Sequence, residues 1–197
     1  MARKVADSEV YVLKITLRGG SPPIWRRIRI SGGASLMDLH RAIQAVMGWD
    51  GYHMFSFEKN RVCFSDVSMF DDMDDVDFAD AGAASIQELL PRVKDKCLYL
   101  YDFGDSWEHE VVLEKKEEYD PGRPLPECIA GKSACPPEDC GGLYGYYNLL
   151  EILADPAHEE YESVLEWVGG PFDPSHFDLE RAKRELASAF RPRKPRK

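Results

Sequence analysis

The chain has 197 residues, of which 44% are hydrophobic and 30% charged, and its net charge is −10. A chain of this size buries roughly 70% of its unfolded surface, so we expect residues 1–190 to form a single domain. No apolar run approaches the ~18 residues that cross a bilayer, and the N-terminus lacks a hydrophobic signal segment. Five cysteines, an odd number, indicate reduced thiols rather than a disulfide framework. These features exclude a membrane protein and favour a cytoplasmic one.

Alternating apolar residues predict a hairpin near the N-terminus. Residues 10–17 place Tyr11, Leu13 and Ile15 on one face, which is the period of a half-buried strand. Gly and Pro at 19–23 break this pattern, and the alternation resumes over residues 24–30. An antiparallel pair of strands is the simplest connection.

A helix is predicted after this hairpin. Residues 36, 39, 43 and 46 are apolar at helical spacing. Ser35 stands at the N-cap position with Asp38 three residues later, and Gly48 stands at the C-terminal end. These signals fix both ends of the expected helix.

The middle of the chain predicts more strands and one exposed insertion. Strands are expected at 52–57 and 62–64, and a second hairpin is expected from 97–103 and 107–113. The Asp-rich segment 66–82 is too charged to pack, so we expect an exposed insertion there. Residues 120–142 are rich in Pro and Gly and predict a long loop.

Helical patterns dominate the C-terminal part. They cover residues 143–153 and 161–168, and a last helix starts with Asp173 or Asp178 as its N-cap. Because strands come first and helices later, the chain is expected to be α+β. We expect a β-grasp-like mixed sheet of about five strands, crossed by one helix and covered by a C-terminal helical cap. Residues 191–197 are expected to form a disordered basic tail.

Two histidines lie in strand patterns beside apolar residues. Alternation puts His109 on the same face as Trp107 and Val111, and it aligns His53 with Phe55. A buried core histidine is one interpretation of His109, and a metal ligand or proton-transfer group is the other. If the two strands are close in the sheet, His53 and His109 share a pocket.

Three cysteines in the long loop suggest a metal site. Cys128, Cys135 and Cys140 supply thiolates of the kind that zinc prefers, and an apolar-poor loop gains stability from such a fastening. The fourth ligand has to come from elsewhere, with His109 or His158 as candidates. No other cofactor is indicated, and three ordinary reduced thiols remain the alternative to a structural zinc ion.

Only two parts of the chain are candidates for binding nucleic acid. The acidic body repels phosphate backbones. The basic tail at 191–197 is one attractive element, and the strand carrying Trp25, Arg26, Arg27 and Arg29 is the other. Given the acidic body, alternating arginines on a solvated sheet face are the favoured explanation of that strand. The sequence lacks the P-loop, G-x-S-x-G and H-E-x-x-H motifs, which removes the readily recognised nucleotide, hydrolase and protease functions.

Several motifs together resemble the Ri-plasmid open-reading-frame-three-like family, whose members are also labelled as TnpR-type insertion-element passenger proteins. They are Pro23 to Arg27, Leu39 to Gln44, Met47 to Trp49, His53, Tyr101 to His109, Pro136 to Gly142, Gly145 with Tyr146, and Phe172 to Pro174. The resemblance implies an α+β fold, a cytoplasmic location, an association with plasmids and mobile elements, and no established activity. It supplies no catalytic residue, and no activated serine in an arginine-rich site supports a recombinase mechanism.

The leading hypothesis is a binding or adaptor domain for a protein or a small ligand, without a membrane role. Its pocket is expected where the hairpin ending at His109 meets the cysteine loop, because turns on a rigid scaffold often carry recognition. The residues expected to line this pocket are His53, Asp102, Asp105, Trp107, His109, Glu138, Asp139 and Tyr146. The alternative is a metal-dependent hydrolase or nucleic-acid-processing enzyme that uses His53, His109 and the nearby acids.

Overall fold

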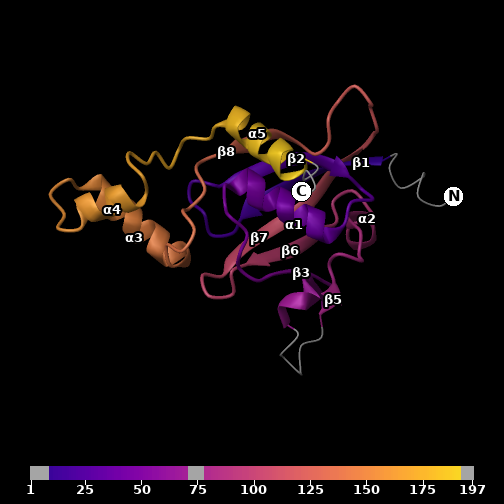
Figure 1. The fold of residues 1–197 in the computed structure, drawn as a ribbon, viewed down its shortest axis with the longest axis horizontal. Helices are drawn as coiled ribbons and strands as arrows, with labels where there is room; N and C mark the ends of the chain where they lie inside the picture. Colours follow the sequence, from indigo (N-terminus) through magenta and orange to yellow (C-terminus); the bar gives the residue numbers. More distant parts are fainter. Residues whose placement is uncertain (1–8, 71–77, 192–197) are drawn as a thin grey trace, which may run out of the picture.

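The computed structural model describes residues 9–70 and 78–191 and consists of one mixed sheet with helices against it (Figure 1). The strands are β1 (Glu9–Leu17), β2 (Trp25–Ser31), β3 (Phe55–Lys59), β4 (Val62–Ser65), β5 (Ala79–Asp80), β6 (Lys96–Tyr101), β7 (Trp107–Glu118) and β8 (Glu127–Lys132). The helices are α1 (Leu36–Met47), the 3-10 helix η3 (Val67–Phe70), α2 (Ile86–Leu89), α3 (Gly142–Ala154), α4 (Tyr161–Trp167) and α5 (Leu179–Ala189).

The sheet confirms the α+β class, but it is larger than predicted. Within the described residues it has eight strands rather than about five, in the order β5-β4-β3-β6-β7-β1-β2-β8. Both predicted hairpins form, since β1 pairs with β2 and β6 pairs with β7 in antiparallel register. Strand β7 also pairs with β1, which joins the two hairpins into one sheet.

Two of the extra strands lie in segments that were expected to be irregular. Strand β8 lies inside the predicted loop at 120–142 and pairs with β2, so a sheet edge fastens this part of the chain. Strand β5 lies in the predicted insertion at 66–82 and pairs in parallel with β4, and Ala81 beside it is fully buried. Residues 71–77 of the insertion lie outside the described residues, as do residues 192–197 of the predicted tail.

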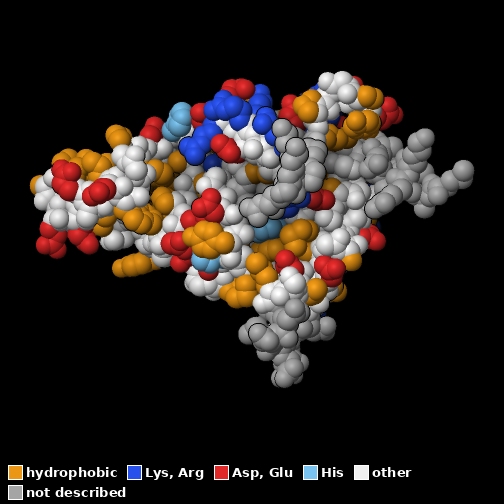
Figure 2. Space-filling model, viewed as in Figure 1, with side chains coloured by type: hydrophobic (Ala, Val, Ile, Leu, Met, Phe, Trp, Pro, Cys, Tyr) orange, Lys and Arg blue, Asp and Glu red, His pale blue; other side chains and the backbone are white. Residues whose placement is uncertain are grey.

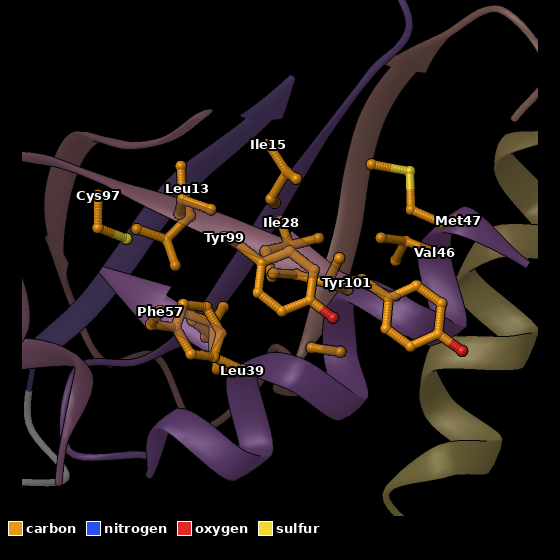
Figure 3. Packing of buried hydrophobic residues seen from close by; sticks show 14 of the residues in the cluster. Leu13, Ile15, Ile28, Leu39, Val46, Met47, Phe57, Cys97, Tyr99 and Tyr101 are labelled. Atoms are coloured by element: carbon orange, nitrogen blue, oxygen red, sulfur yellow. The ribbon is translucent and has the colours of Figure 1, made fainter. Parts of the chain in front are cut away.

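Helix α1 has the ends that its sequence predicts. The Asp38 amide donates to Ser35 Oγ at 3.0 Å, and Gly48 adopts a left-handed conformation with φ of 88°. The buried face of α1 packs on the sheet with rings from β3 and β6, as Figure 3 shows for Leu39, Phe57, Tyr99 and Tyr101. This rigid layer supports the turns at the ends of the strands.

The C-terminal helices fall into two groups. Helix α5 starts at the Asp178 cap, whose Oδ1 accepts from the Arg181 amide at 2.8 Å, and it buries Ala182 and Leu186. Helices α3 and α4 extend away from the sheet instead (Figure 1). Among the described residues, no helix is both long enough and apolar enough to cross a membrane.

Candidate functional site

Three turns from distant parts of the chain meet at one end of the sheet. They are residues 49–53 after α1, residues 102–105 between β6 and β7, and residues 136–141 before α3. The Asp50 amide donates to Glu138 Oε2 at 2.7 Å, and the Gly141 amide donates to Asp105 Oδ2 at 3.1 Å. We call this surface the three-turn site. Figure 2 shows acidic, histidine and hydrophobic side chains lying together on the visible face.

An imidazole lies between two carboxylates at the centre of this site. His53 Nε2 is 2.9 Å from Asp139 Oδ1 and 3.6 Å from Asp102 Oδ2. One ligand atom from each of the three residues lies within 4.8 Å of the others, and no other such group of three is found among the described residues. The side chains of His53 and Asp102 are 27% and 12% exposed and that of Asp139 is 53% exposed, so the cluster is open to solvent.

The second oxygen of each carboxylate is held by the surrounding turns. Asp102 Oδ1 accepts from the Gly104 amide at 2.9 Å and from the Asp105 amide at 3.3 Å. Asp139 Oδ2 accepts a hydrogen bond from the Tyr52 hydroxyl. Each carboxylate therefore directs its other oxygen toward the His53 ring in a fixed orientation.

The tyrosines around the cluster change the acidity of the groups that they touch. The hydrogen bond from Tyr52, followed by that from His53, holds the pKa of the Asp139 carboxyl below its usual value. The same bond to Asp139 raises the pKa of Tyr52 to about 12. Burial raises the pKa of Tyr101, and its hydroxyl donates to Glu138. Both phenols stay protonated at neutral pH, so they act as donors that orient carboxylates.

Trp49 fastens the three-turn site to the core below it. Its Nε1 donates to the Pro136 carbonyl at 2.9 Å, which anchors the turn at 136–141. Its ring stacks on Tyr101 with centroids 5.2 Å apart and tilts against Trp107 at 5.6 Å. The floor of the site is thus a packed aromatic layer.

A concavity of about 1040 Å³ adjoins the three-turn site. It runs between α1 and α5 and reaches Asp50 and Gly51. Its walls include Arg181, Glu185 and Arg191, and Figure 2 shows basic side chains gathered over α5. A ligand larger than an ion therefore has room to extend from the site along α1.

The structure does not place His109 and Trp107 in this site. Both side chains have no exposed surface, because the alternation of β7 turns them into the core. His109 Nδ1 donates to the Trp107 carbonyl at 2.9 Å, and burial lowers the pKa of His109 to about 4. His109 is a neutral core histidine and shares no pocket with His53, which precedes β3 and lies at the surface.

Tyr146 is likewise separate from the cluster. It is only 3% exposed on α3, where its ring packs edge-on against Phe172 with centroids 6.3 Å apart. The residues expected to line one pocket are therefore divided by the structure. His53, Asp102, Asp105, Glu138 and Asp139 meet in the three-turn site.

The expected zinc ligands do not assemble either. Cys128, Cys135, Cys140 and His109 contribute no group of three ligand atoms among the described residues. Cys128 lies on β8, which β2 and β1 separate from the strand carrying His109. Burial raises the pKa of the Cys128 thiol to about 11 and those of the Cys135 and Cys140 thiols to about 12. All five cysteines are free thiols.

The arginines of β2 are occupied within the fold. Arg27 is paired with Glu114 at 2.5 Å. Arg29 is 2% exposed and pairs with Glu117 at 3.0 Å and Glu127 at 2.9 Å. These acidic partners neutralise Arg27 and Arg29 on β2, the strand that the sequence offered as a candidate nucleic-acid surface.

Three residues of the site are not among the predicted ones: Asp50, Tyr52 and Tyr101. Tyr52 and Tyr101 fall within predicted strands, although each is adjacent in sequence to a predicted site residue, His53 or Asp102. The signal that could have identified them is a tyrosine directly beside a His or Asp of the site, because a phenol can donate a hydrogen bond to a nearby carboxylate.

The comparisons with known proteins agree with this fold. The plasmid pRiA4b ORF-3-like protein family matches residues 9–181. The chain belongs to this family. The uncharacterized protein y4hQ of Sinorhizobium fredii is 36% identical over 167 residues, which are 82% of this chain and 82% of that protein. The crystal structure of the protein of unknown function MM3350 from Methanosarcina mazei Go1 superposes with a TM-score of 0.77 at 38% identity, covering 88% of this chain and 96% of that one.

The family resemblance drawn from the sequence motifs is confirmed by this match. Four of the eight motifs that carried the resemblance lie in or next to the three-turn site: 47–49, His53, and the segments 101–109 and 136–142. Membership establishes an α+β family with a plasmid association, and it supplies no activity. Function therefore has to be argued from the site itself.

Proposed function

We propose that this ORF-3-like protein is a cytoplasmic binding domain that recognises a cationic ligand at the three-turn site. The observation that carries the proposal is the convergence of three separate turns on His53, Asp102 and Asp139 at an open surface. Turns held by a rigid scaffold are where recognition residues commonly lie. The site lies over the core, which packs beneath it around Trp49.

The charge of the site supports a cationic ligand. Five carboxylates surround it, on Asp50, Asp102, Asp105, Glu138 and Asp139. Tyr52 is 56% exposed beside them and offers a ring face as well. Carboxylates pair with ammonium, guanidinium or metal cations, and aromatic faces attract the same charges. An anionic ligand meets repulsion on this surface.

The test is an NMR titration of the full chain with hexalysine, with hexaglutamate as the matched negative probe. Hexalysine should shift the backbone signals of residues 50–53, 102–105 and 138–141 first. The acidic residues of α4 and the segment before it provide the internal control, because they carry charge without the cluster geometry. Equal shifts over that control segment and the site would reject specific recognition, and so would the absence of any shift.

A second candidate function is metal-dependent hydrolysis or nucleic-acid processing. The observation that favours it is the imidazole facing two carboxylates, since His can transfer protons beside an ion that activates water. His53 then replaces His109 as the working histidine, because His109 is enclosed in the core. Cleavage of bis(4-nitrophenyl) phosphate in the presence of Mn²⁺, lost in the His53→Ala variant, would support the enzyme over the binding domain.

A further inference from the structure

We propose that His53, Asp102 and Asp139 bind one divalent ion of the first transition row, such as Zn²⁺ or Mn²⁺. This inference rests on the proposed function, because it names the cation that the three-turn site holds. The ligand atoms are His53 Nε2, Asp102 Oδ2 and Asp139 Oδ1. The first lies 3.6 Å from the second and 2.9 Å from the third.

These separations match the edges of a coordination sphere. Ligands about 2.1 Å from a metal lie about 3.0 Å apart at octahedral corners and about 3.4 Å apart at tetrahedral corners. The two measured separations bracket this range, and one ligand atom from each of the three residues lies within 4.8 Å of the others. A single ion therefore reaches all three atoms with only small movements of side chains.

The surrounding turns orient the ligands as metal sites require. The oxygen of Asp102 that faces away from His53 takes two backbone amides, and that of Asp139 takes the Tyr52 hydroxyl. Ligating carboxylates in metalloproteins are held by hydrogen bonds of this kind.

The donor set also selects the class of ion. One imidazole nitrogen and two carboxylate oxygens favour borderline divalent ions, whereas soft ions prefer the thiolates that this site lacks. Three protein ligands at a surface open to solvent leave positions for water or for a ligand atom. The neighbouring carboxylates of Asp50 and Glu138 add attraction for any divalent cation.

The competing explanation is a direct ion pair between a protonated His53 and the two carboxylates. Both explanations use the same contacts, but they differ in what a metal ion does. In the ion-pair case Zn²⁺ and Mn²⁺ have no preferred place at His53. In the proposed case they displace the direct contact and bind the imidazole.

Isothermal titration with ZnCl₂ and MnCl₂ on the chelator-treated full chain tests this at pH 7.5. We expect one bound ion per chain, and we expect His53→Ala and Asp139→Asn each to weaken binding at least about tenfold. The matched control is His176→Ala, which removes another exposed histidine far from the cluster in sequence. This variant should bind the ion within about twofold of the wild type.

A direct readout on the wild type guards against variants that disturb the turns. Substoichiometric Mn²⁺ should broaden the ring signals of His53 before those of His158 and His176 by paramagnetic relaxation. The inference is overturned if no ion binds, if all three histidines broaden alike, or if one-to-one binding survives both His53→Ala and Asp139→Asn. If hexalysine still shifts residues 50–53 while no metal binds, this inference falls and the proposed function stands.

Discussion

Two buried histidines should make the stability of this protein strongly dependent on pH. Burial lowers the pKa of His40 to about 4 and that of His109 to about 4, from an ordinary value of 6.5. His40 is 6% exposed, stacks on Phe55 with centroids 3.8 Å apart and shares a 2.8 Å hydrogen bond with Tyr99, while His109 has no exposed surface. Both imidazoles are neutral in the folded chain above about pH 5.

The sign follows from proton uptake by the unfolded chain. Above pH 6.5 both states hold neutral rings, and the full stability is present. As the pH falls below 6.5 the unfolded chain takes up a proton on each ring while the folded chain does not, so the free energy of unfolding decreases. Each histidine should lower the free energy of unfolding by about 2 kcal/mol between pH 7.5 and pH 5, and by about 3 kcal/mol between pH 7.5 and pH 4. Together the two histidines therefore lower the free energy of unfolding by about 4 kcal/mol at pH 5, which is a large part of the total stability of a typical domain.

Urea unfolding measured from pH 7.5 to pH 5 tests this, since most carboxylates remain ionised in that range. The variants His40→Gln and His109→Gln keep a polar group of similar size but cannot titrate, so each should remove about half of the pH dependence. His176→Ala, at an exposed position, is the control and should leave the slope unchanged. A slope that is the same in the wild type and in both glutamine variants would refute the argument that burial keeps these rings neutral.

Three further predictions concern the support of the site and the thiols. Trp49→Phe removes the donor to the Pro136 carbonyl and should cost about 2 kcal/mol in urea unfolding, with the signals of residues 136–141 shifting most in NMR spectra; a loss confined to α1 would contradict this. Gly145→Ala should destabilise the fold strongly, because a Cβ there falls 1.7 Å from the Cys140 carbonyl oxygen, whereas Gly20→Ala meets only ordinary contacts and should be nearly neutral by thermal unfolding. Cys97 and Cys128 are the two buried cysteines, so their thiols should react with Ellman's reagent at pH 8 only as fast as the chain unfolds, whereas Cys63, Cys135 and Cys140 are partly buried; rapid labelling of all five thiols in the native protein would count against this.

Local patterns predicted much of the fold because periodicity reports which face of an element is buried. The alternation over residues 10–17 and the caps at Ser35 and Gly48 are local signals, and the structure has the expected strand and helix. Strand β8 was missed because its sequence Glu127–Lys132 includes Gly and lacks apolar alternation. It forms through pairing with β2, which is a tertiary effect that no local pattern contains.

The site was predicted in part for the same reason. The turns at 102–105 and 136–141 were expected to meet, and they do, because their Asp, Gly and Pro residues mark loops at the ends of elements. The alternation that aligned His109 with Trp107 predicts burial, and the structure shows the core histidine. His53 was extrapolated into a strand that begins two residues later, at Phe55, so its surface position depended on a boundary that sequence defines poorly.

The arrangement of the cluster explains why its geometry depends on the whole fold. Its three ligand atoms come from segments 49 and 37 residues apart along the chain, at positions 53, 102 and 139, so the unfolded chain does not hold them together. Trp49 and Asp105 fix the turns to one another through backbone groups of the partner segment. Whatever cation the site takes therefore binds the folded chain in preference to the unfolded one, and at a hundredfold excess over Kd it adds about 2.7 kcal/mol to the stability of the native state.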